Sequence, residues 1–389
     1  MNHTFLSTLL LAGMSCGMPC LAQWEEYPPA PPALPSSPAN EFAIQIFHTL
    51  AETQPGNFIF SPMGLNAVLG ILQQGARGTT AMALSELPLG QPASLSSMCP
   101  TEANALFIAD TLTLKSGTDV NAVYRVPFET DTAAAVKDIN TWSATQTLGL
   151  IPAIVTQNDI NSLTRMVATC AIYLNEKWLY PFKKNQTQEN ILFTMSDGSL
   201  TTVNMMYSRN EYRYAEGEDW QAVALPYDTM GRSGEPGYFI GILPLGNVRD
   251  FARTLTPDKY QRILTALTIY GEQETIVRLP RFEMNPGTIS LAPALQACGL
   301  GNIFTPQADF SGFTNEAIYM SNILQRCYVK TDEDGTEAAA VTAAIGICWA
   351  AAPSPVRPRE INFNRPFIWI IGDLNSTAPP YFMGLFEQP

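Results

Sequence analysis

The sequence predicts a domain of the α+β class, in which helices and strands occupy different stretches of one large unit. Apolar residues recur at helical spacing early in the chain, as in residues 41–52 and 62–75. Short apolar runs typical of buried strands follow later, as in residues 223–227 and 239–244. No Gly/Ser linker or run of charges divides the chain after about residue 40, and 46% of all residues are hydrophobic, which suits one large core.

The acidic composition limits the range of partners. The formal net charge is −13 at pH 7. Because a negative surface repels phosphate groups, we expect neither nucleic acid nor an anionic membrane to be the main partner.

The N-terminus has the pattern of an export signal. Residues 5–14 are mostly apolar, and small residues stand near Ala22. This predicts a signal peptide over residues 1–22 that is cleaved after Ala22, and the apolar run is too short to span a bilayer. The protein is therefore expected to be secreted or periplasmic. A lipid anchor on Cys16 is the less favoured alternative, because residues 13–15 make a poor lipid-attachment motif.

A Pro-rich segment follows the predicted signal peptide. Repeated prolines in residues 28–38 favour an extended linker, which we place over residues 23–39. The folded domain is then expected to occupy residues 40–389.

The cysteines give no sign of a metal site. Seven are present, and two of them lie within the predicted signal peptide. The remaining five are odd in number and lack the spacing of metal ligands, which favours buried or free thiols. They are Cys99, Cys170, Cys298, Cys327 and Cys348.

Local signals place the individual elements in order. A short strand over residues 57–60 leads into a helix that Ser61 can cap, with Pro62 in its first turn and Gly75 at its end. Residues 103–108 begin a strand. Later segments predicted as strands are residues 166–174, 203–206, 223–227, 239–244, 366–371 and 381–386.

The stretch that stands out is residues 332–349, which is acidic at its start and then small and apolar. Because side chains of a strand alternate between two faces, this segment as a strand would carry only small residues on one face. β-branched residues and Gly weaken the alternative of an Ala-rich helix. The small face consists of Thr336, Ala338, Ala340, Thr342, Ala344 and Gly346, and the opposite face begins with Glu337, Ala339 and Val341.

Several motifs, in this order along the chain, resemble the serpin family. They are residues 57–80, Trp178, the stretch 332–349 and the run Phe363-Asn364-Arg365-Pro366-Phe367. The resemblance covers about residues 40–389. It implies the serpin fold, with three β-sheets, about eight to nine helices and an exposed reactive-centre loop. Hinge and loop together would span about residues 333–358.

No catalytic constellation is visible in the sequence. The only histidines are His3, in the predicted signal peptide, and His48, in a helical pattern where a structural role is expected. A G-x-S-x-G match at residues 13–17 also lies in the signal and lacks a strand-turn-helix context. Phosphate loops, dinucleotide fingerprints and zinc motifs are absent. We therefore expect no enzyme, no cofactor and no metal.

The resemblance instead implies a protease inhibitor of the suicide-substrate type. The target protease cleaves the exposed loop, becomes acylated, and is trapped when the cleaved loop inserts into the main sheet as a new strand. The hinge residues that this step requires are Glu333, Gly335, Thr336, Glu337, Ala338, Ala339, Ala340 and Thr342.

The hinge also weighs against the alternative of a non-inhibitory serpin with a binding, carrier or chaperone role. Its inward positions are all small, and the charged Glu337 falls on the outward face. No proline occurs from residue 335 to residue 352, so no hydrogen-bond donor would be missing from an inserted strand.

The reactive bond is expected between Trp349 and Ala350, by the family's usual count of seventeen residues from Glu333, with Cys348 as the alternative bait. An aromatic residue there favours chymotrypsin-like serine proteases, and the neighbouring alanines favour elastase-like ones. Papain-like cysteine proteases are the second class of target. Trypsin-like enzymes should be poor targets, because no Lys or Arg precedes Arg357 in the loop. We expect the inhibitor to be a monomer.

The resemblance also assigns Ser61 and Trp178 to the shutter and the breach, the regions where the main sheet opens. The chain departs from the family pattern nearby. Gly64 stands where a serine is frequent, Cys170 where an asparagine is frequent, and Gln325 where a histidine is frequent. These departures leave open how the sheet opens, though not the fold.

Overall fold

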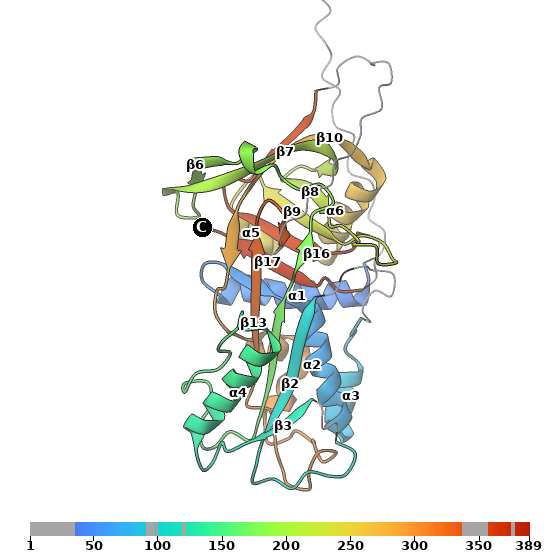
Figure 1. Ribbon diagram of the computed structural model, residues 1–389. Helices are drawn as coiled ribbons and strands as arrows, with labels where there is room; N and C mark the ends of the chain where they lie inside the picture. Colours follow the sequence, from blue (N-terminus) through green and yellow to red (C-terminus); the bar gives the residue numbers. More distant parts are fainter. Residues whose placement is uncertain (1–35, 91–97, 99, 119–121, 337–356, 375–377) are drawn as a thin grey trace, which may run out of the picture.

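The computed structural model describes residues 36–90, 98, 100–118, 122–336, 357–374 and 378–389 (Figure 1). Within these residues helices pack against two β-sheets, which confirms the α+β class. The predicted signal peptide and nearly all of the predicted linker lie outside the described residues, so the expected boundaries remain predictions. None of the described helices is both long and apolar enough to cross a membrane.

The described residues form seven α-helices, close to the eight to nine expected. The predicted cap of α2 is confirmed, because Ser61 Oγ accepts a hydrogen bond from Gly64 N and Pro62 starts the helix. The helices are α1 (Pro38–Thr53), α2 (Pro62–Gly75), α3 (Gly78–Ser85), α4 (Thr132–Gln146), α5 (Val248–Thr254), α6 (Pro257–Tyr270) and α7 (Ala292–Leu295). A π-helical turn, Gln296–Leu300, continues α7.

The larger sheet has nine strands, most of them in the upper half of Figure 1. Its order is β1 (Phe58–Phe60), β17 (Phe382–Phe386), β16 (Phe367–Gly372), β9 (Tyr238–Pro244), β8 (Trp220–Pro226), β7 (Leu200–Glu216), β10 (Glu272–Pro280) and β15 (Arg359–Asn362). The ninth strand, β6 (Gln188–Thr194), pairs with β7.

The long strand β7 explains why two continuous sheets are found where three were expected. Residues 200–213 of β7 pair with β6 and β10, and residues 213–216 pair with β8. Two of the expected sheets therefore share this strand and are joined through it.

The second sheet has eight strands and contains the candidate site. Its order is β3 (Val123–Val126), β2 (Thr101–Ala109), β4 (Met166–Tyr173), β13 (Asn322–Thr331), β14 (Gly335–Thr336) and β5 (Glu176–Lys177). Two short strands, β11 (Phe282–Met284) and β12 (Ile289–Ser290), pair with β13.

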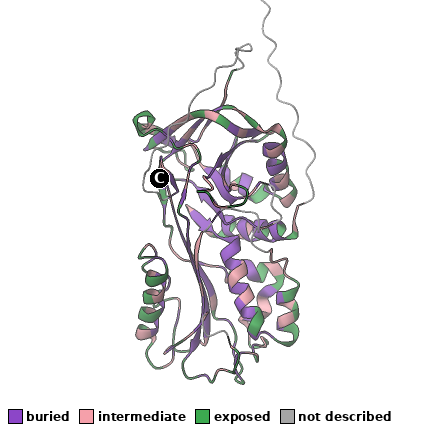
Figure 2. Ribbon diagram, turned by 45° about the vertical axis from the view of Figure 1, so that its right-hand side comes forward, coloured by how far each residue is buried: buried purple, intermediate pink, exposed green. Residues whose placement is uncertain are grey.

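Helices cover both faces of the eight-stranded sheet. Helix α2 packs against β2 and β4 on one face, and α4 lies against β2 and β3 on the other. Figure 2 shows the sheet between these helices, with exposed residues on the outer side of α4 and buried residues facing the sheet. A strand added to the middle of this sheet would therefore have to fit against a closely packed helical layer.

Candidate functional site

The central strands of the eight-stranded sheet are closed at one end and separated at the other. β4 and β13 pair directly in parallel, from Asn322 opposite Val167 to Tyr328 opposite Tyr173. Beyond that point β14 lies between β13 and β5 and is antiparallel to both. Thr336 faces Thr331 on one side and Glu176 on the other. The hinge residues Gly335 and Thr336 thus already form a short strand within the sheet.

Both residues of β14 fit this position closely. A Cβ atom on Gly335 would lie 2.3 Å from the carbonyl oxygen of Glu176, so only glycine allows the two strands to approach this far. Thr336 is fully buried, and its Oγ1 is 2.8 Å from the hydroxyl oxygen of Tyr227. Burial raises the pKa of Tyr227, which keeps this phenol neutral and able to hydrogen-bond.

Trp178 lies directly beside β14 and contacts the turn that precedes it. Its indole Nε1 donates to Asp332 O at 2.9 Å, and its main-chain N donates to Asp334 O at 3.1 Å. The ring stacks on Tyr227, with the ring centres 4.8 Å apart and the planes at 7°. Trp178 therefore holds the turn between β13 and β14 through both its main chain and its side chain.

Three ion pairs surround β14. Arg281 pairs with Glu333, Lys184 with Asp334 at 2.7 Å, and Arg232 with Glu176 at 2.5 Å. Two of the three carboxylates are almost inaccessible, since the side chain of Glu333 is 2% exposed and that of Glu176 is 1% exposed. Unpaired carboxylates would be costly at such buried positions, so the cations are needed to keep them there.

The carboxylate of Glu333 accepts hydrogen bonds from two side chains. Besides Arg281, Thr187 donates its hydroxyl hydrogen to Glu333 Oε1 at 2.6 Å. Burial would raise the pKa of Glu333, but these hydrogen bonds outweigh it and hold the pKa below its usual value. Glu333 therefore stays ionised at neutral pH.

A second cluster lies under the closed part of the sheet, at the start of α2. Ser61 N donates to Gln325 Oε1 at 2.7 Å, and Gln325 Nε2 donates to Ser61 O at 2.9 Å. Ser61 Oγ also donates to Tyr381 O at 2.6 Å. Ser61 and Gln325 are both fully buried, so one glutamine side chain satisfies both main-chain groups of Ser61.

The three departures from the family pattern meet in this cluster. Cys170 is the register partner of Gln325, and its Sγ is 3.5 Å from Gln325 Nε2. A Cβ atom on Gly64 would lie only 2.3 Å from Cys170 Sγ. Gly64 and Cys170 are therefore coupled, because the larger sulfur atom occupies the space that a side chain at position 64 would need. Burial raises the pKa of Cys170, which keeps it a neutral thiol.

The remaining predicted site residues lie outside the described residues. These are Glu337, Ala338, Ala339, Ala340, Thr342, Cys348, Trp349 and Ala350. The described site residues Ser61, Trp178, Glu333, Gly335 and Thr336 all line the junction of β4 and β13 or its extension. Three further residues of the site were not among those predicted, because they lie 52 or more positions from their partners along the chain. They are Tyr227 and Arg232, in the segment between β8 and β9, and Arg281, between β10 and β11.

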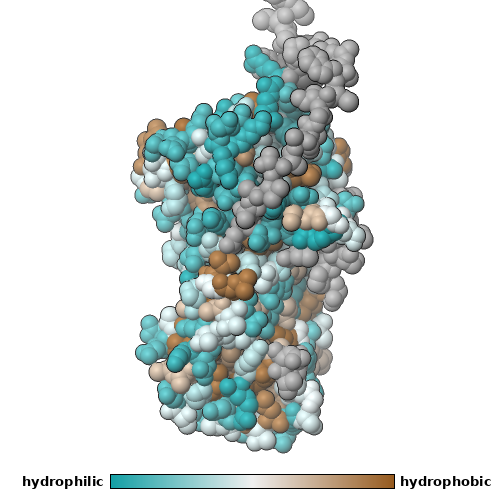
Figure 3. Space-filling model, viewed as in Figure 1, coloured by the Kyte–Doolittle hydropathy of each residue, from teal (hydrophilic) through white to brown (hydrophobic). Residues whose placement is uncertain are grey.

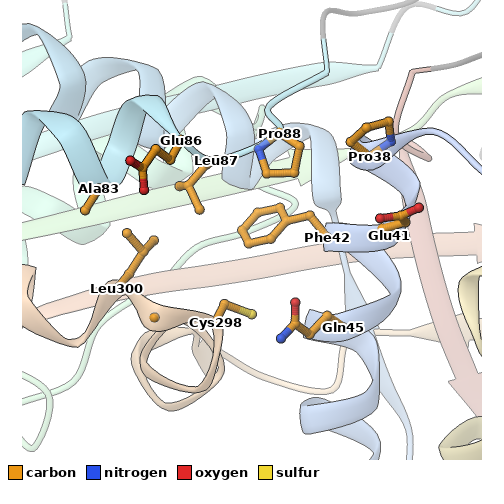
Figure 4. A pocket seen from close by; sticks show the side chains of 11 residues that line it. Pro38, Glu41, Phe42, Gln45, Ala83, Glu86, Leu87, Pro88, Cys298 and Leu300 are labelled. Carbon is orange, nitrogen blue, oxygen red and sulfur yellow. The ribbon is translucent and has the colours of Figure 1, made fainter.

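A cavity of about 380 Å³ lies apart from this junction, between α1, the end of α3 and the π-helical turn (Figure 4). Phe42 and Leu300 form its apolar wall, and Glu41 and Glu86 lie at its sides. None of the described site residues lines it. His48, the one histidine in the described part of the chain, has its Nε2 2.7 Å from Leu255 O, in agreement with a structural role.

Comparison with known proteins gives the same fold along almost the whole chain. Rat leukocyte elastase inhibitor A is 28% identical over 386 residues, covering 91% of this chain and 99% of that protein. Plasminogen activator inhibitor 1 of Neovison vison is 28% identical over 386 residues, covering 90% of this chain and 92% of that protein. The crystal structure of Manduca sexta serpin-12 superposes with a TM-score of 0.73 at 23% identity, over 91% of this chain and 99% of that one. The family model for serpins (serine protease inhibitors) matches residues 37–389, and the chain therefore belongs to the serpin family.

Proposed function

We propose that this protein is an inhibitory serpin that traps a target protease as a covalent acyl complex. The observation that carries the proposal is the position of β14. Gly335 and Thr336 lie between β13 and β5, antiparallel to both, where the next residues of the chain could continue the same strand.

The two registers of β14 lead to the same alignment. Thr336 pairs antiparallel with Thr331 of β13, so residue 342, six positions later, would pair with Gln325. Thr336 also pairs antiparallel with Glu176 of β5, so on that side residue 342 would pair with Cys170 of β4. Gln325 and Cys170 are already partners in the closed sheet. A strand that continues from Thr336 would therefore enter between β4 and β13 without a shift of register, and would replace one parallel pairing by two antiparallel ones.

The hinge composition suits this inserted strand. Its inward positions 338 and 340 would face Val329 and Cys327 on β13, which are buried. Ala338 and Ala340 bring no charge and little volume to these positions. Glu337 would face Lys330, which is half-buried, and Asn175, which is exposed, so its carboxylate would remain solvated.

The target is proposed from the bait sequence and from the relatives. Trp349 as the residue before the cleaved bond favours a chymotrypsin-like serine protease, and Cys348 with the alanines favours an elastase-like one. One relative is named as an inhibitor of leukocyte elastase. Inhibition of a papain-like cysteine protease is the second candidate. We propose secretion or periplasmic location from the predicted signal peptide.

The proposed monomer agrees with the surface. On the face seen in Figure 3, hydrophobic residues form small separate patches within a mainly hydrophilic surface. Size-exclusion chromatography with light scattering gives the mass directly, and a stable dimer would contradict this part of the proposal.

The test is incubation with chymotrypsin-, elastase-, trypsin- and papain-like proteases, followed by denaturing gels and mass spectrometry of the released C-terminal peptide. A complex that survives denaturation, with a peptide that begins at Ala350, supports inhibition at Trp349. A complex with only trypsin-like enzymes would move the reactive bond to Arg357 or Arg359. Plain cleavage by every class would favour a non-inhibitory serpin.

A further inference from the structure

The loop between β8 and β9, residues 227–237, extends from the nine-stranded sheet to β5. We call the space between β13 and β5, in which β14 lies, the slot, and β5 the β5 wall of the slot. At the start of the loop, Asp228 N donates to Lys177 O at 2.8 Å, and Leu179 N donates to Pro226 O at 2.9 Å. Main-chain hydrogen bonds therefore join β5 to the β8–β9 loop, and Leu179 to the end of β8.

Arg232 adds a side-chain connection from the middle of this loop. Its main-chain N and its Nε both donate to Thr229 O, at 2.9 and 3.0 Å. The Nε end of the guanidinium group is therefore held by the turn from Thr229 to Arg232. A terminal nitrogen of the same group then donates to Glu176 Oε2 at 2.5 Å. The side chain of Arg232 is 32% exposed, whereas that of Glu176 is 1% exposed. The loop therefore supplies the cation for a buried carboxylate on β5.

Glu176 is the residue of β5 on which the position of β14 depends. It is the register partner of Thr336, and its carbonyl oxygen sets how closely Gly335 can approach. The other two ion pairs act elsewhere, because Glu333 and Asp334 belong to the turn between β13 and β14. Arg232 is thus the cation that acts on the β5 wall of the slot.

We propose that Arg232 is a positioning residue that holds β5 in place, so that the cleaved loop begins its insertion in a single register. This inference rests on the proposed inhibitory function. Cleavage by the protease does not involve Arg232, so acylation should be unaffected by its loss. Insertion without a fixed wall should be slower, and more acyl-enzyme would then be hydrolysed before the protease is trapped.

The test compares wild type with Arg232→Ala, Glu176→Gln, the double variant and Arg232→Lys, using whichever protease the wild type traps. We expect a several-fold higher stoichiometry of inhibition for Arg232→Ala, with an unchanged rate of acylation. Glu176→Gln and the double variant should match it, and Arg232→Lys should restore part of the loss. Hydrogen exchange in residues 174–182 should be faster in all variants that lack the pair.

Two outcomes would overturn the proposal. If only Arg232→Ala is impaired, while Glu176→Gln and the double variant behave as wild type, the arginine merely neutralises a buried charge. If no variant differs from wild type in stoichiometry or in hydrogen exchange, Arg232 does not position β5. Arg253→Ala is the control, since its pair with Asp250 is exposed and lies on α5, away from the slot.

The experiment separates this inference from the function on which it rests. If the wild type traps no protease, the proposed function fails, and the hydrogen-exchange comparison alone still decides whether Arg232 holds β5. If the wild type traps a protease and the variants trap it equally well, the function stands and the role of Arg232 is wrong.

Discussion

Two regions of one sheet, the closed part and the part that holds β14, are stabilised in different ways. In the closed part β4 and β13 pair in parallel over a neutral cluster of Ser61, Cys170 and Gln325. Around β14 the strands pair antiparallel, three ion pairs surround them, and Trp178 stacks on Tyr227.

The difference indicates which region opens and which stays fixed. Parallel pairing is slightly less stable per residue than antiparallel pairing, and a neutral hydrogen bond contributes only about 1 kcal/mol net. Separating a buried ion pair is costlier, because it leaves a desolvated charge. The closed part is therefore the one suited to yield to a new strand, and the surroundings of β14 are suited to hold its start.

The largest expected effect comes from a charge on the inserting face. Ala340→Arg should leave the intact protein folded but convert it from inhibitor to substrate, because position 340 would face Cys327 and Ile172, both fully or almost fully buried. Denaturing gels should show cleaved protein in place of complex. Glu337→Gln is the matched control on the outward face and should inhibit normally. Equal inhibition by both variants would refute insertion at this register.

The next effect concerns the closed part. Gln325→Ala removes the acceptor of Ser61 N, whereas Ser61 O keeps Leu65 N as a donor. The variant should therefore lower the free energy of unfolding of the intact protein by about 1–3 kcal/mol. Urea unfolding monitored by circular dichroism measures it. The same variant should insert its loop more readily without cleavage. A slow loss of inhibitory activity, accompanied by a change of mobility on native gels, would show this. An unchanged midpoint would mean that the cluster contributes little to keeping the sheet closed.

A smaller effect tests the coupling between Gly64 and Cys170. Gly64→Ala should destabilise the intact protein by about 1–3 kcal/mol, because its Cβ would overlap Cys170 Sγ. Adding Cys170→Ala should recover part of this loss. Gly70→Ala on the same helix is the control, since a Cβ there meets no atom within 4 Å. If Gly64→Ala and Gly70→Ala are equally tolerated, the two positions are not coupled.

The smallest effect is a pH dependence at Glu333. Its folded-state pKa is lowered, so it contributes stability that is present above the ordinary glutamate pKa and is lost as the pH falls through the folded value. Thermal unfolding from pH 7 to pH 3 should therefore show wild type losing about 1 kcal/mol more than Glu333→Gln, a modest difference because Arg281 is partly exposed. Parallel curves for the two proteins would rule this contribution out.

The order of elements could be predicted from the sequence because the signals are local, as with Ser61, which caps α2 through a group three residues away. The small face of residues 332–349 stays a prediction from strand alternation, since residues 337–349 lie outside the described part of the chain. The cation partners of the site could not be predicted, because Arg232 and Glu176 are separated by 56 residues and Arg281 and Glu333 by 52. The members of the neutral cluster were named from the family pattern, but their bonds could not be predicted: Gln325 stands 264 residues from Ser61, where a histidine is frequent, and makes its own pair of bonds to the Ser61 main chain.

The central claim is that, after cleavage, the chain from Glu337 onward enters between β4 and β13. It is tested most directly by thermal unfolding of the intact protein and of the same protein cleaved once in the loop by a protease that it does not trap. The cleaved form is predicted to unfold at a markedly higher temperature, because two antiparallel ladders replace the parallel one and the small face of the hinge is buried. A cleaved form that unfolds at the same temperature as the intact protein, or below it, would contradict the account.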